Sequence, residues 1–273
     1  MEISEFALNI YKILVEWPLS FRILVGFIPF FIYFVVRYYF KSYKCKKDFV
    51  IEDGKDVEDE EICIRMKASF KEYLQNQSKV KTVSFMFNED IGYEEMGFGK
   101  EKITCLGIVN AANSEVKPGM GGLNAGITVW VGGRYGIITD QQGQKEWCDL
   151  KMLNRLRKLD PKKIGLVAVS NFTEGHVFHV VGPQACLVGT QKYVKSLSGV
   201  TETLIKAYKD CLFQAKNLKC SHIIFPLISG GIFCESNPSE GFSESEFLNA
   251  VQLAVKKFIQ NADFKDIKVY FNI

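Results

Sequence analysis

The stretch GIVNAANSEVKPGMGGLNAG, residues 107–126, joins a short apolar strand to asparagines and a glycine-rich loop. Glycines let successive backbone N–H groups approach an anion and curl around it. The match to the dinucleotide-binding pattern GxGxxG fails at Asn124, and the absence of a following GK[ST] excludes a phosphate-binding P-loop. Glycines alone are equally typical of a structural turn, so the function depends on what accompanies this loop.

A second strand followed by a glycine turn lies in IIFPLISGGIF, residues 223–233. Ligands of open α/β sheets bind beyond the carboxyl ends of the strands, where such loops meet. Two glycine loops on one rim therefore predict a clamp around a diphosphate. Phe233, beside the second loop, would stack on a sugar or else be an ordinary core residue.

The chain from about residue 80 onward alternates strand-like and helix-like patterns. Strands are expected at 81–87, 103–109, 165–170, 177–181, 222–227 and 267–273, and helices at 147–159, 200–215 and 247–258. This alternation favours an α/β fold, in which helices cover a sheet of mixed strand direction.

Four segments resemble the macro domain family, whose members bind ADP-ribose. The segments follow one another in the family's order and at the family's spacings. They are IVNAAN at 108–113, GMGGLNAGI at 119–127, HVVGP at 179–183 and FPLISGGIF at 225–233. The resemblance covers about residues 80–273. It implies a three-layer α/β/α sandwich with a mixed central sheet, with ADP-ribose or an ADP-ribosylated protein as partner. No cofactor is expected.

The resemblance also implies roles for individual residues. Asn113 would hydrogen-bond the distal ribose, and Phe233 would pack against it. Asp90, paired with Ile91, would accept a hydrogen bond from the adenine amino group, although the stretch 92–106 is longer than the family pattern, and Asp90 could also be a solvated loop acid. The full implied set of ligand-binding residues is Asp90, Ile91, Asn110, Asn113, Gly121, Gly122, Leu123, Ser229, Gly230, Gly231, Ile232 and Phe233.

The enzyme question depends on Asn113 and Asn124, the two candidate catalytic residues. Hydrolases of one branch of the family carry Asp at the position of Asn124. An amide cannot act as a general base, but it can orient water by hydrogen bonds. Family members without this Asp also hydrolyse the linkage, with help from the substrate's phosphate. Removal of mono-ADP-ribose from proteins, recognition of ADP-ribose without turnover, and a scaffold that has lost its ligand all remain open.

The first 47 residues predict an amphipathic helix followed by a membrane anchor. Apolar residues recur at helical spacing from Ile3 to Trp17, and the segment 17–40 is long enough to span a bilayer as a single pass. Arg22 and Arg37 lie near its ends, where long basic side chains can reach the interface. A buried core helix and an interfacial hairpin bent at Pro29 are the alternatives.

The charges that flank this segment predict its orientation. Basic residues are concentrated in 37–47, which by the positive-inside rule puts the C-terminal domain in the cytosol. Residues 48–79 then form a tether. Seven of the ten residues 52–61 are acidic and repel one another, and residues 62–74 could form a helix that leads into the domain.

Composition excludes several other classes of protein. A hydrophobic fraction of 47% supports a real core, and a net charge of +3 gives no sign of sequence-specific nucleic-acid binding. The eight cysteines include no CxxC pair, which argues against zinc fingers and redox dithiols. His176 and His179 are three apart in a strand-like run and face opposite ways, so they are expected to be core or turn residues and no metal site is expected.

Overall fold

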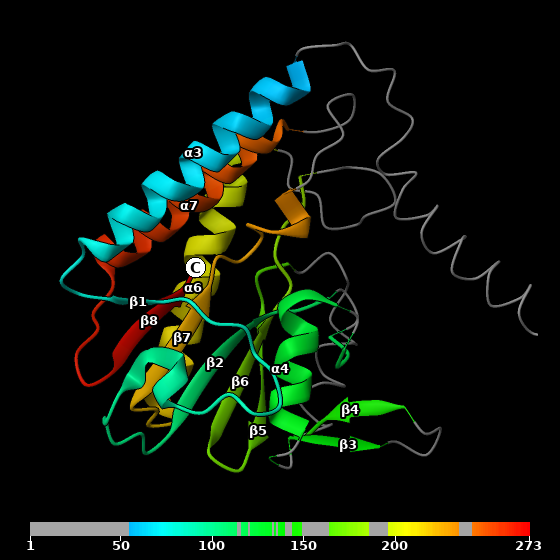
Figure 1. Cartoon of the computed structure of the whole chain (residues 1–273), viewed down its shortest axis with the longest axis vertical. Helices are drawn as coiled ribbons and strands as arrows, with labels where there is room; N and C mark the ends of the chain where they lie inside the picture. The colour runs from blue at the N-terminus through cyan, green and yellow to red at the C-terminus, as the bar shows by residue number, and fades with distance from the viewer. Residues whose placement is uncertain are drawn as a thin grey trace, which may run out of the picture. The chain divides into compact units, whose positions relative to one another are not determined.

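The computed structural model describes residues 55–113, 116–119, 121–132, 134, 136–139, 144–148, 164–185, 196–234 and 242–273. They belong to one compact unit, which runs from Gly54 to Ile273. Its centre is a six-stranded sheet in the order β1-β8-β7-β2-β6-β5, as Figure 1 shows. The six strands are β1 (Lys81–Val83), β2 (Leu106–Ala111), β5 (Val167–Phe172), β6 (Gly175–Val180), β7 (His222–Pro226) and β8 (Lys268–Asn272).

The sheet is mixed in direction. β5 runs antiparallel to β6, whereas the other neighbouring strands pair in parallel. A separate hairpin pairs β3 (Ile137–Thr139) with β4 (Lys145–Trp147). The predicted mixed sheet is therefore present.

Helices cover both faces of the sheet (Figure 1). The described helices are α3 (Lys55–Gln75), α4 (Gly122–Gly132), α6 (Leu197–Asn217) and α7 (Glu244–Asn261), with a π-helical turn at Glu94–Phe98 and a 3₁₀ turn at Ile232–Cys234. α3, α6 and α7 share one hydrophobic core with one face of the sheet, and α4 shares a second core with the other face. The predicted three layers of an α/β/α sandwich are observed.

The strands form because they are covered on both faces. In β2, Ile108 belongs to the core on the α4 side and Val109 to the core on the side of α6 and α7. This alternation follows from the two-residue period of a strand. All five residues of β7 are buried, as is typical of a parallel strand in the middle of a covered sheet.

α4 was not expected from the sequence, because glycines at 122, 126 and 132 lower its helix propensity. Packing compensates for this. Trp130 is fully buried and makes edge contacts with the rings of Phe87 and Phe172. Gly126 faces the backbone carbonyl of Phe87, which a Cβ would approach to 3.0 Å. Tertiary contacts, rather than local preference, thus stabilise this helix.

The helix considered for residues 62–74 is present as part of α3. Phe70 and Leu74 are buried in the core that α3 shares with α7. The helix expected over 147–159 lies outside the described residues except at its start, where Trp147 ends β4.

Among the described residues, none of the helices is both long enough and apolar enough to cross a membrane. The expected amphipathic helix and membrane segment, within residues 1–47, lie outside the described part of the chain.

Candidate functional site

The two glycine loops lie at one edge of the sheet. β2 pairs in parallel with both β6 and β7, so the loops that follow these strands emerge on the same side. The end of β6 and the segment after it contact both glycine loops. The Ala112 N–H donates to the Val180 carbonyl at 2.8 Å, and the Ala185 N–H donates to the Phe233 carbonyl at 3.0 Å. Segments far apart in the sequence therefore meet at this edge.

Asn113 closes the first loop. Its Nδ2 donates to the Lys117 carbonyl at 2.7 Å, and its Oδ1 accepts from the Lys117 N–H at 3.1 Å. Beyond this turn, Gly121 and Gly122 adopt left-handed φ angles of 95° and 55°, which other residues rarely adopt. α4 begins at Gly122, so the first N–H groups of the helix have no partner within it and can bind an anion.

A buried polar network lies beneath this loop. Asn110 is fully buried, and its Nδ2 donates to Asn124 Oδ1 at 2.5 Å and to His179 Nδ1 at 3.1 Å. Burial lowers the pKa of His179 to about 3, so the ring is neutral. Its Nε2–H then donates to Ser170 Oγ at 2.7 Å. Asn110, expected to bind the ligand, thus directs its side chain into this network.

Asn124 holds the first loop from below. Its Nδ2 donates to the Lys117 carbonyl at 2.9 Å and also to the Gly119 carbonyl. Only 4% of the residue is exposed. Both amide hydrogens are therefore used inside the protein, and the side chain supports the loop in which a hydrolase would have its Asp.

The second loop turns sharply after β7. The Gly230 N–H donates to the Leu227 carbonyl and the Cys234 N–H to the Gly231 carbonyl, while Ser229 takes a left-handed φ of 66°. Ser229 is 4% exposed, and its hydroxyl has no hydrogen-bond partner within the described part of the chain. Gly231 is exposed, and no atom lies within 4 Å of the position a Cβ would take. Phe233 is half-buried.

Asp90 and Ile91 lie alongside α4. Asn88 Oδ1 accepts from the N–H groups of both residues at 3.0 and 2.8 Å, and the Ile91 carbonyl accepts from Trp130 Nε1 at 2.9 Å. Trp130 is eight residues beyond Gly122, about 12 Å along the helix. The structure thus unites the two glycine loops and sets Asp90, which is exposed, further along α4.

Residues 109–237 match the family model described as Macro domain. This part of the chain is therefore similar to the macro domain family. The match contains both glycine loops, all of β7 and the second half of β2.

Solved macro domains are similar to this chain at low identity. The Oceanobacillus iheyensis macrodomain with ADP is 23% identical over 62% of this chain and 77% of that one, with a TM-score of 0.39. The Trypanosoma brucei macrodomain in complex with ADP-ribose is 16% identical over 62% of this chain and 58% of that one, with a TM-score of 0.34. No curated protein matches the sequence significantly.

The region around the first loop also contains a support that the sequence did not reveal. Thr128 Oγ1 donates to the Asn124 carbonyl at 2.6 Å and accepts from the Gly119 N–H at 2.7 Å. Thr128 lies inside a helix that its sequence does not predict, so no local signal marked it. His179 was expected to be a core or turn residue, and it is a core residue whose role depends on contacts with Asn110 and Ser170.

Proposed function

We propose that this macro domain binds ADP-ribose at the edge where β2 and β7 end. The observation that carries the proposal is the pair of glycine loops on these neighbouring parallel strands. The N–H groups at the start of α4 and in the second loop beside Gly231 would hold the diphosphate, because backbone donors at a helix N-terminus favour negative charge. The unpartnered hydroxyl of Ser229 supports the same position for the ligand.

The remaining contacts follow the family pattern. Leu123 and Ile232 complete the first and second loops, Asn113 and Phe233 take the distal ribose, and Asp90 takes the adenine. The exposed position of Asp90 leaves its carboxylate open to a ligand.

The proposal favours recognition of ADP-ribosylated proteins over rapid hydrolysis. The side chain at 124 is an amide that is buried and donates both hydrogens to loop carbonyls. It therefore supplies neither a general base nor a free donor to orient water. Hydrolysis of mono-ADP-ribose, if present, would be a slow reaction assisted by the substrate's own phosphate.

Binding is tested with the full chain by calorimetry. The protein should bind ADP-ribose with a micromolar Kd, about −8 kcal/mol. Gly231→Glu should abolish binding, because the new carboxylate occupies open space beside the diphosphate and repels it. Gly132→Glu, the same change at the far end of α4, should bind normally. Unchanged affinity of Gly231→Glu for ADP-ribose would show that the ligand does not bind at the proposed site.

A second assay separates the reader from the hydrolase. The same proteins are incubated with a mono-ADP-ribosylated acceptor, and bound acceptor and free ADP-ribose are both measured. Retention without release is expected. Fast release that Gly231→Glu eliminates would make the protein a hydrolase instead.

We also propose that residues 17–40 anchor the protein in a membrane with the macro domain in the cytosol, on the sequence pattern alone. Protease added to sealed microsomes should digest the domain, and carbonate should leave the protein in the membrane. A protected domain would reverse the orientation, and release by carbonate would exclude the span.

A further inference from the structure

Two cysteines and a histidine meet at the edge of the sheet opposite the glycine loops. Cys105 directly precedes β2, Cys220 precedes β7, and His176 is the second residue of β6. These three parallel strands are neighbours, with Leu106 paired to His222 and Gly107 paired to His176. Their amino-terminal ends therefore bring together residues that are up to 115 positions apart.

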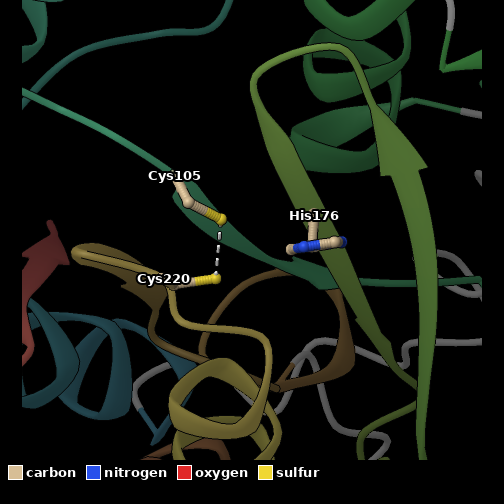
Figure 2. A group of neighbouring side chains, drawn as sticks. All are labelled: Cys105, His176 and Cys220. Carbon is tan, nitrogen blue, oxygen red and sulfur yellow. Dashed lines mark hydrogen bonds between the residues drawn. The ribbon is translucent and has the colours of Figure 1, made fainter.

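Figure 2 shows the two thiols facing each other, with the His176 ring across from them. The Sγ atoms are 3.3 Å apart, and the ligand atoms of all three residues lie within 4.8 Å of one another. Tetrahedral zinc with Zn–S bonds near 2.3 Å sets two sulfurs about 3.8 Å apart. Small side-chain rotations would thus suffice to surround one ion.

We infer that Cys105, His176 and Cys220 form a zinc-binding site. Thiolate and imidazole ligands together select Zn²⁺ among the common divalent cations. Two thiolates and a neutral imidazole would balance the charge of the ion, and a water would take the fourth position. Cys220 is 3% exposed, whereas Cys105 and His176 are half-buried, so the open position faces solvent on their side.

A fourth side chain supports this assignment. Asn171, on the adjacent strand β5, lies 2.8 Å from His176 through Oδ1 and Nδ1. The amide oxygen accepts the Nδ1–H, which fixes the tautomer and leaves the lone pair of Nε2 for a metal. Metal-binding histidines almost always donate their other N–H to such an acceptor. Asn171 would therefore be a positioning residue.

The protonation of the pair agrees with this geometry. The hydrogen bond with Cys220 lowers the pKa of the Cys105 thiol, and His176 acts in the same direction. A thiolate is the form that binds metal. Zinc binding would replace the contact between the two thiols and release their protons to solvent.

The full chain is tested after reduction and treatment with a chelator, by titration with Co²⁺ as a spectroscopic probe. One equivalent should produce the thiolate-to-cobalt band and the intense visible bands of four-coordinate cobalt, and Zn²⁺ should abolish them. Cys105→Ala and Cys220→Ala should each lose the thiolate band. Cys63→Ala, which changes a cysteine on α3 that is as buried as Cys220, should keep the thiolate band. Bands that survive in both cluster variants would overturn the proposal.

The histidine is tested by zinc competition. Asn171→Ala should weaken zinc binding by about 10–100-fold, and Asn171→Asp should restore it because a carboxylate also accepts the Nδ1–H. Asn171 is exposed, so these changes should not unfold the protein. Unchanged affinity in both Asn171→Ala and His176→Gln would overturn the site.

Two further measurements test the fold of the variants and the redox state of the two thiols. Binding of ADP-ribose at the opposite edge reports that each variant is folded, and Gly231→Glu should bind Co²⁺ like the parent. A Cys105–Cys220 disulfide found by mass spectrometry of protein kept with equimolar zinc would overturn the metal site in favour of a redox pair.

Discussion

At the scale of single residues, the sequence and the structure suggest different roles for Asn124. In the sequence it stands in the first loop, where a hydrolase has an acid. In the structure its amide accepts from Asn110 and donates to the carbonyls of Lys117 and Gly119. A carboxylate has no hydrogens to donate, so it could not make the last two bonds.

Asn124→Asp should therefore destabilise the protein and weaken ADP-ribose binding. Leaving two carbonyls without donors, beside a new charge, should cost on the order of 1–3 kcal/mol at pH 7. Because a protonated carboxyl regains one donor, the loss of stability caused by Asn124→Asp should become smaller as the pH falls. Urea unfolding at pH 7 and pH 5 measures this. A variant as stable as the parent that hydrolyses ADP-ribosyl-carboxylate faster would instead establish position 124 as a catalytic position.

At the scale of elements, one carboxylate connects three strands at the edge of the sheet. Glu101 lies 2.9 Å from Lys81 of β1, 2.9 Å from His222 of β7 and 2.8 Å from Lys268 of β8. It also accepts from the Tyr270 hydroxyl at 3.1 Å. Hydrogen bonds from Lys268, His222 and Lys81 hold the pKa of Glu101 well below its usual value.

Glu101→Gln should lower the free energy of unfolding at pH 7 by on the order of 1 kcal/mol, because Lys81 and Lys268 are more than half exposed and solvent screens their charges. A folded pKa below the unfolded one gives stability that is present above the unfolded pKa, about 4.3, and is lost as pH falls further. The difference between parent and variant should therefore narrow below about pH 4. Glu72→Gln, an exposed change of the same charge, should have little effect. A pH-independent difference would contradict the ionic role.

At the scale of the whole molecule, α3 belongs to the same compact unit as the sheet. Figure 1 shows α3 lying along α7. Leu74 is fully buried, and Gln252 of α7 donates to the Met66 carbonyl at 3.2 Å. The Lys71 ammonium also donates to the carbonyl of Ile273 at 3.3 Å. The helix therefore covers an apolar face of α7, in the part of the chain that the sequence suggested was a tether.

A fragment that starts at Val80 should be much less stable than one that starts at Gly54. Removal of α3 exposes its contacts on α7, and truncation of one of them, Phe70→Ala in the longer fragment, should already cost about 3–5 kcal/mol. Urea unfolding of the three proteins measures the order of stability. Equal stability of the two fragments would show that α3 is a linker after all.

The sequence by itself determined the fold class and most strands, and it revealed the resemblance to macro domains. β7 and β2 are short apolar runs that end in glycine loops, and α6 and α7 have clear helical periodicity. These signals are local. A strand that is buried on both faces is apolar throughout, and a helix that is buried on one face has apolar residues at helical spacing. The residues of the two glycine loops, among them Asn113 and Phe233, could likewise be identified from the sequence.

Only the tertiary structure decided α4, the support role of Asn124 and the cluster of Cys105, His176 and Cys220. α4 forms against its own propensity because Trp130 packs into a core. The network beneath the loop and the metal-binding cluster join residues on different strands, and strand register sets their distances. Register depends on contacts between segments remote in the chain, so no spacing within the sequence could reveal it.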